Sequence, residues 1–203
     1  MFKNNNQSIL AAMRKLILFM HTSLDGFVGG PNGEIDWVNV DDEIFDYISA
    51  EVDKADTALY GRVTYQMMES YWPTAGEQPG ASKHDQHHAA WYNNVAKVVL
   101  STTMKGMNLH NTTIISYHLV TEIKKIKAAP GNDILIFGSP SAAHSLMAEN
   151  LIDDYWLFVN PVLLAKGIPL FSGIKDITKL KLLLSHSFTS GVVCLHYTTS
   201  QGT

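Results

Sequence analysis

The sequence predicts an α/β fold built on a mixed, mostly parallel central sheet that is flanked by helices and ends in an antiparallel hairpin. Three observations predict it. Short apolar segments alternate with segments of helical period from residue 15 to residue 160. Three apolar segments end in small residues directly before a helix, which is typical of one edge of a parallel sheet. The last two apolar segments are joined by a Ser190-Gly191 turn and therefore form a hairpin.

The first strand and helix have clear patterns. Residues 15–22 (KLILFMHT) are almost continuously apolar, which predicts a buried central strand. Residues 41–55 place Ile44, Ile48 and Val52 at helical spacing, and acidic residues fill the first turn, where the helix dipole favours negative charge. These residues therefore predict a helix that packs against the sheet.

The next segments are shorter. Residues 57–60 predict a strand that ends at Gly61, and residues 63–70 predict a helix that Trp72-Pro73 ends, because proline disfavours helical conformation in the residue before it. A loop is expected over residues 74–82, and a further helix over residues 83–94.

The second half of the chain continues the alternation. The segment 133–137 (DILIF) is apolar on both faces, so it should lie centrally in the sheet. Residues 180–188 and 192–197 form the expected hairpin. The remaining expected strands are 97–101, 112–116 and 155–159, and the remaining expected helices are 118–127 and 141–150.

Length and composition indicate one compact domain. The 203 residues are 46% hydrophobic and 17% charged, which supports a sizeable core over residues 13–203. Residues 1–12 are polar and are expected to form a disordered extension, or to precede a true start at Met13. The lone Cys194 excludes a disulfide framework and a multi-cysteine zinc site, and no metal is expected. We expect a cytoplasmic protein that binds neither membrane nor nucleic acid, because there is no long apolar run and the net charge is −4.

Charge is distributed unevenly along the chain. Residues 16–53 contain nine acidic residues and no lysine or arginine, whereas the rest of the chain carries all 15 basic residues. This pattern fits a protein that holds a neutral or cationic group at one end and an anionic group at the other. It fits equally well two solvated faces of opposite charge.

Three strand ends suggest where an anionic ligand binds. They lie within residues 59–64, 99–103 and 136–141, and each leads into a small-residue turn. Helix N-termini at such turns present unpaired N–H groups to phosphate. Arg62, one of only two arginines, follows one of these strands and suits a pyrophosphate or a 2′-phosphate. Because no GxGxxG or P-loop motif is present, a Rossmann dinucleotide fold or a nucleotide triphosphatase is disfavoured.

Several motifs together resemble the dihydrofolate reductase superfamily, and within it the branch containing the C-terminal reductase domain of bacterial riboflavin biosynthesis. The resemblance covers about residues 13–198 and implies a dihydrofolate reductase-like fold, a homodimer and an NADPH-dependent reductase. The motifs, in chain order, are SLDGF (23–27), GGPNGEIDW (29–37), GRVTY (61–65), DILIFGS (133–139), LID (151–153), PVLL (161–164) and GIPLF (167–171).

The resemblance implies a set of cofactor-binding residues at these turns. One group would hold the pyrophosphate and its ribose, Ser101 and Thr102 would lie at the adenosine 2′-phosphate, and a third group would wrap the diphosphate at a helix start. Val28 and Gly29 would border the nicotinamide. The first group is Gly61, Arg62, Val63 and Thr64, and the third is Gly138, Ser139, Pro140, Ser141 and Ala142.

The same resemblance implies a substrate side. Residues 30–36 would form a mobile loop that closes over the substrate, and Asp42 would be the proton donor, with Asp46 as the alternative. Such a carboxyl, if buried beside the nicotinamide, would have a raised pKa. The other reading of Asp42 is a helix-capping acid, and the other reading of Asp25 is a turn residue. The residues assigned to the substrate side are Ser23, Asp25, Trp37 and Asp46.

The expected function is hydride transfer from NADPH to a small heterocyclic or carbonyl substrate. NADH is not excluded, because Thr102 or Thr103 stands where the family usually has an arginine. Two alternatives remain open: the 5-amino-6-(5-phosphoribosylamino)uracil reductase of riboflavin biosynthesis, and a nucleotide-binding module without turnover. The acidic segment 16–53 argues against a phosphorylated substrate there. His84, His87 and His88 could suggest a metal cluster, but we expect solvent-facing histidines on a helix.

Overall fold

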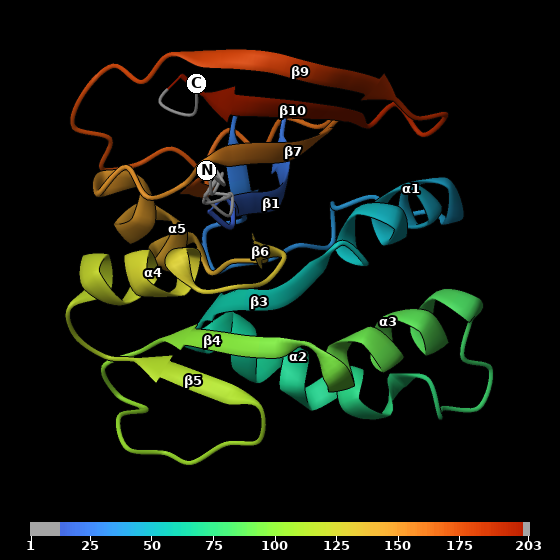
Figure 1. The fold of residues 1–203 in the computed structure, drawn as a ribbon. Helices are drawn as coiled ribbons and strands as arrows, with labels where there is room; N and C mark the ends of the chain where they lie inside the picture. The colour runs from blue at the N-terminus through green and yellow to red at the C-terminus, as the bar shows by residue number, and fades with distance from the viewer. Residues whose placement is uncertain (1–12, 201–203) are drawn as a thin grey trace, which may run out of the picture.

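The computed structural model describes residues 13–200, so the disordered extension expected for residues 1–12 lies outside the described residues. Its main sheet has eight strands in the order β5-β4-β3-β6-β1-β7-β10-β9 (Figure 1). Neighbours from β5 to β7 are parallel, and β10 is antiparallel to both β7 and β9. The α/β class with a mostly parallel sheet and a C-terminal hairpin is therefore confirmed. The strands are β1 (Leu16–Ser23), β3 (Ala55–Gly61), β4 (Ala96–Leu100), β5 (Thr112–Ile115), β6 (Asp133–Ile136), β7 (Asp154–Asn160), β9 (Leu180–Ser187) and β10 (Val193–Thr199).

Helices cover both faces of this sheet. On one face, α4 and α5 pack against the even-numbered residues of β1, including Leu16 and Leu18. On the other face, α1 packs against Ile17 and Phe19, while α2 and α3 cover β3 and β4. The helices are α1 (Asp42–Val52), α2 (Arg62–Ala75), α3 (Lys83–Asn94), α4 (Leu119–Ala128) and α5 (Pro140–Ala148).

The central strands are buried on both faces, as their sequences predict. β6 lies between β3 and β1, and Ile134, Leu135 and Ile136 are at most 3% exposed. A parallel strand covered by helices on both faces has no solvent side, so its residues can be continuously apolar. Because β3 and β6 are parallel neighbours in the middle of the sheet, their carboxyl ends lie side by side.

A second, two-stranded sheet was not predicted. It pairs β2 (Phe27–Gly29) with β8 (Ile168–Pro169). Both strands are too short to show an alternating pattern, so no sequence signal identifies them. The pairing brings the backbone of Gly167 so close to Gly29 that a Cβ at position 167 would overlap the Gly29 carbonyl oxygen.

The prediction that Trp72-Pro73 ends a helix is wrong. The helix α2 continues to Ala75 with Pro73 inside it. The Trp72 ring lies 4.1 Å from the His88 ring of α3, and Ala75 is only 2% exposed, so the last turn packs against its neighbours. We infer that this packing offsets the cost of the missing proline N–H, since tertiary contacts commonly override local propensity.

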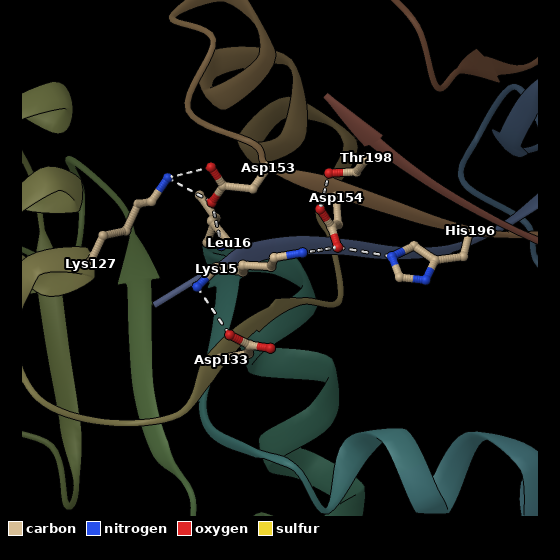
Figure 2. A network of polar contacts seen from close by, with 8 residues as sticks. All are labelled: Lys15, Leu16, Lys127, Asp133, Asp153, Asp154, His196 and Thr198. Carbon is tan, nitrogen blue, oxygen red and sulfur yellow. Dashed lines mark hydrogen bonds and ion pairs between the residues drawn. The ribbon is translucent and has the colours of Figure 1, made fainter. Parts of the chain in front are cut away.

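A polar network ties together the amino ends of the parallel strands (Figure 2). The buried carboxylate of Asp154 accepts hydrogen bonds from Lys15 Nζ at 2.9 Å and Thr198 Oγ1 at 2.8 Å, and it lies 2.8 Å from His196 Nε2. Lys127 Nζ donates to Asp153 in the same region. These contacts connect β1, β7, β10 and α4 at the sheet edge opposite the strand carboxyl ends.

Candidate functional site

A cavity of about 480 Å³ lies at the carboxyl ends of β3, β4, β5 and β6. Segments far apart in the sequence meet here because parallel neighbouring strands end at the same edge of a sheet. The cavity brings together eight of the residues assigned to the cofactor: Gly61, Arg62, Val63, Ser101, Thr102, Ser139, Ser141 and Ala142.

Three helices begin at this cavity, and none of them has a side-chain cap at its N-terminus. They are α2, α4 and α5, whose N-cap residues are Gly61, His118 and Ser139. By contrast, α1 is capped by Asp41 and α3 by Ser82. Uncapped first turns leave backbone N–H groups available and carry a partial positive charge. The cavity is therefore suited to an anionic ligand such as a phosphate.

The charge of the lining supports the same conclusion. None of the lining residues is acidic, and none comes from the acidic segment 16–53. Arg62 is exposed at the start of α2, where its Nη1 donates to Gln66 Oε1 at 2.9 Å within the same helix. The lining also offers hydroxyl groups from Thr102, Ser141 and Ser145. This donor set fits a phosphorylated cofactor.

The turns after β3 and β6 are in direct contact. The Gly61 N–H donates to the Gly138 carbonyl oxygen at 2.9 Å, and a Cβ at position 61 would overlap Ser139 Oγ. Gly138 has φ +104°, a conformation that favours glycine, and a Cβ there would lie 3.3 Å from Thr64 Oγ1. Gly138, Thr64 and Pro140 thus shape the turns next to the cavity without lining it.

Ser101 has a structural role in addition to its place in the lining. Its hydroxyl accepts the Met104 N–H and contacts Thr103 Oγ1 at 3.2 Å, so it closes the turn after β4. Its carbonyl oxygen accepts a hydrogen bond from Ser116 Oγ at 2.8 Å. These bonds join the ends of β4 and β5.

Sequence reasoning missed a fourth strand end. The turn after β5 contributes Ser116, Tyr117 and His118 to the lining, and Ser145 was missed as well. The signal was present, because residues 112–116 were an expected strand directly followed by an expected helix. What the sequence lacks is the strand order, which places β5 beside β4.

The residues expected at the nicotinamide and over the substrate lie outside this lining. Val28 is buried in the core, and Gly29 ends β2. Residues 30–36 form a turn in which the Gly30 N–H donates to the Glu34 carbonyl oxygen at 2.8 Å. Trp37 Nε1 donates to the same carbonyl oxygen at 3.1 Å. The closing of this loop over a substrate remains a prediction.

Ser23 and Asp25 brace a turn. The Ser23 hydroxyl donates to Asp25 Oδ1 at 2.6 Å, and the Asp25 carboxylate accepts the N–H groups of Leu164 and Ala165. The Ser23 hydrogen bond, followed by these backbone bonds, lowers the pKa of Asp25. The structure therefore supports the turn-residue reading of Asp25, and its oxygens already have protein partners.

The burial expected for a proton donor is not found at Asp42. Its side chain is 97% exposed and that of Asp46 is 82% exposed, and neither lines the cavity. Both project from α1 toward α3, where their oxygens lie 3.7 and 3.6 Å from His84 Nε2. The physical reason is that Ile44, Ile48 and Val52 occupy the buried stripe of α1 and leave these acids outside it.

The three histidines of α3 do not all face solvent, which corrects the sequence interpretation. His84 is 16% exposed and stacks on Phe45 at 4.7 Å, and His87 lies 3.3 Å from Asp53. His88 lies between Trp72 and Trp91, and burial lowers its pKa to about 4. Among residues 13–200, no group of three or more His, Cys, Asp or Glu side chains is placed to hold a metal ion.

His21 is a half-buried polar residue near the carboxyl end of β1 that sequence reasoning also missed. Its ring stacks on Phe158 at 5.0 Å, and its Nδ1 lies 3.4 Å from Asn160 Nδ2. Burial lowers the pKa of His21 to about 4, so the imidazole is neutral at pH 7.

Residues 14–194 match the protein family described as the RibD C-terminal domain. An uncharacterized Bacillus subtilis protein, YyaP, is 32% identical over 188 residues, which cover 91% of this chain and 94% of that protein. A solved structure assigned to riboflavin biosynthesis in Shewanella sp. PV-4 has a TM-score of 0.71 at 22% identity, covering 92% of this chain and 99% of that one.

The dihydrofolate reductase of Enterococcus faecalis, solved in complex with NADP(H), has a TM-score of 0.60 at 12% identity. That comparison covers 92% of this chain and 96% of the reductase. The fold is therefore dihydrofolate reductase-like, as the motifs predict. No helix within residues 13–200 is both long and apolar enough to span a membrane.

Proposed function

The chain belongs to the RibD C-terminal domain family, and on this premise we propose that it is an NADPH-dependent reductase of a small heterocyclic or carbonyl compound. The observation that carries the proposal is the cavity at the strand ends. It combines three uncapped helix N-termini, Arg62 and several hydroxyl groups, and no acidic residue lines it. A dinucleotide with a diphosphate matches this donor set.

The residues present fit the cofactor by the chemistry of their donors. The N-termini of α2 and α5 adjoin, because Gly61 and Gly138 are hydrogen-bonded, so their N–H groups and Arg62 would hold the diphosphate. Ser139 and Ser141 would add hydroxyl donors at the start of α5. The nicotinamide dinucleotide supplies a hydride when bound. In the same proposal, Val28 and Gly29 border the nicotinamide.

The reduction also needs a proton, and Asp42 is not the buried proton donor that the family resemblance implies. Asp42 and Asp46 are exposed, so a catalytic role would require α1 or the loop 30–36 to move over the substrate. Without such a movement, we propose that water donates the proton. Replacement of Asp42 by asparagine is then expected to leave turnover within about twofold of the unchanged protein.

The pyrimidine reductase step of riboflavin biosynthesis is a second candidate. It is favoured by the family match over residues 14–194. The acidic segment 16–53, which includes the exposed carboxylates of α1, disfavours a phosphorylated substrate on that side. The two candidates differ in one measurable property, namely whether the substrate must carry a phosphate.

The test has two stages. Titration of NADPH fluorescence should show saturable binding to the purified protein. Turnover is then measured as loss of absorbance by the reduced nicotinamide with pterins, small carbonyls and phosphorylated or unphosphorylated pyrimidine compounds. Lack of NADPH binding would contradict the proposal. Binding without turnover on any of these compounds would support the third alternative, a nucleotide-binding module.

A further inference from the structure

The cavity has two ends that are far enough apart to meet two different anionic groups. It crosses the neighbouring strands β5, β4, β3 and β6, and strands in a sheet are spaced about 4.8 Å apart, so its ends are separated by roughly 14 Å. The β3–β6 end carries Arg62 and the N-termini of α2 and α5. The β4–β5 end is formed by residues 101–103 and 116–119.

A second cation stands at the β4–β5 end. Lys105 Nζ lies 4.9 Å from the centroid of the Tyr117 ring, which lines the cavity and is 57% exposed. A lysine over an aromatic ring is held there by a cation–π interaction. The preceding residue, Met104, is only 5% exposed and anchors the turn. The ammonium of Lys105 is thus held beside Tyr117, a residue of the cavity lining, by a side chain that follows an anchored turn.

The surrounding charges leave Lys105 available to a ligand. Five lysines within residues 13–200 pair with a carboxylate, and Lys105 is not one of them. The acid in the first turn of α4, Glu122, lies 4.0 Å from Lys125. His118 begins α4 without a side-chain cap, so the first N–H groups of α4 add a partial positive charge at this end.

We propose that Lys105 is the specificity-determining residue that binds the adenosine 2′-phosphate and selects NADPH over NADH. The inference rests on the proposed function, because it assumes a dinucleotide in this cavity. A 2′-phosphate carries nearly two negative charges at pH 7, which an ammonium group and the α4 N-terminus can both neutralise. The exposed Tyr117 ring positions the ammonium. Thr102 and Thr103, which stand where an arginine was expected, carry no charge themselves.

The test uses fragments of the cofactor, so that binding is read without catalysis. Adenosine 2′,5′-bisphosphate and AMP differ only in the 2′-phosphate, and calorimetry gives both dissociation constants. The unchanged protein should bind the bisphosphate about tenfold more tightly than AMP. Lys105→Gln should abolish this difference, whereas Lys105→Arg should keep most of it. Lys179 is an exposed residue that precedes β9, the strand at the opposite edge of the sheet. Lys179→Gln is therefore the matched charge control and should behave like the unchanged protein.

The outcomes separate the two proposals. If the unchanged protein binds neither fragment nor NADPH, the cavity is not a dinucleotide site and the proposed function fails. If it binds NADPH but does not distinguish the two fragments, or if Lys105→Gln still distinguishes them, the role of Lys105 is overturned and the proposed function stands. If Lys179→Gln loses the preference equally, the effect is one of net charge and the role of Lys105 is likewise overturned.

Discussion

Arg62 is the residue at which the cofactor assignment is most directly testable. It begins α2 at the cavity, and among residues 13–200 the hydrogen-bond partner of its guanidinium is Gln66 Oε1 at 2.9 Å. A guanidinium that lies beside an uncapped helix N-terminus can approach a diphosphate without leaving its helix. Removal of this group should therefore affect the ligand more than the fold.

We expect Arg62→Ala to weaken NADPH binding by about 1.5 kcal/mol, the lower part of the range for hydrogen bonds to charged groups, because the side chain is exposed. Fluorescence titration measures the change. Gln66→Ala is the control, since it removes the partner of Arg62 and leaves the guanidinium in place. An unchanged dissociation constant in Arg62→Ala would exclude a contact with the cofactor.

Gly138 has a backbone conformation that favours glycine, and it lies beside the cavity. Because its φ is +104°, Gly138→Val should lower the free energy of unfolding by about 2 kcal/mol or more. The new side chain would also press on Thr64 and Met20 and shift Ser139, so NADPH affinity of the folded protein should fall at least about tenfold.

Gly173→Val provides the comparison for this variant. Gly173 has φ +74° and no atom within 4 Å of an added Cβ, so only the backbone cost applies there. Urea denaturation and NADPH titration are carried out on both variants. Equal NADPH affinity in the two would mean that the turn after β6 does not position the cofactor.

At the scale of elements, the Asp154 network holds the amino ends of β1, β7 and β10 together (Figure 2). Burial alone raises the pKa of Asp154, but hydrogen bonds from His196, Lys15 and Thr198 and the charge of Lys15 outweigh it and lower the pKa to about 2. An unfolded aspartate has a pKa near 4. The ionised form is thus favoured by folding, and its contribution is complete above about pH 4 and is lost as the pH falls through 2.

Asp154→Asn should therefore cost about 2 kcal/mol of unfolding free energy at pH 6, and about half of that at pH 3. Chemical denaturation at the two pH values measures the difference. Asp176 is exposed, so the control variant Asp176→Asn should change the free energy of unfolding little at either pH. A cost for Asp154→Asn that is the same at pH 3 and pH 6 would contradict the assignment of the lowered pKa to Asp154.

At the scale of the whole molecule, the edge strand β9 is the most exposed apolar element. All eight of its residues are exposed, and Leu180, Leu182, Leu183 and Leu184 are between 37% and 47% exposed. The hairpin partner β10 differs, because it lies between β7 and β9, and Val192 before it is fully buried. The exposed apolar surface of the hairpin is therefore concentrated on β9. An open apolar edge strand favours pairing with another chain.

We propose that a second copy covers β9 in a homodimer. Light scattering at about 10 µM should give twice the mass of one chain, and Leu183→Lys should give a monomer, because a charge at the edge opposes strand pairing. Leu163→Lys, at a site that is 68% exposed outside any strand, should remain dimeric. A monomeric unchanged protein would contradict the proposal.

The amino-acid sequence by itself determined the fold class, the order of the main elements and half of the cavity. Continuous apolar runs such as 133–137 predict buried parallel strands because a strand covered on both faces has no side that faces solvent. Small residues after such strands then place Gly61, Ser101 and Ser139 at one sheet edge. The strands and the turns that follow them depend only on local period and on the common direction of parallel strands, whereas the assignment of individual residues to the cofactor was implied by the family resemblance.

Only the tertiary structure decided which strand ends are neighbours and which way each helix faces. The order β5-β4-β3-β6 adds Ser116, Tyr117 and His118 to the site, and no local pattern encodes that order. The same holds for Asp42, whose acidic turn suits both a cap and a catalytic carboxyl. The rotation of α1 about its axis is set by packing of Ile44, Ile48 and Val52 on the sheet, and this packing leaves Asp42 in solvent beside His84.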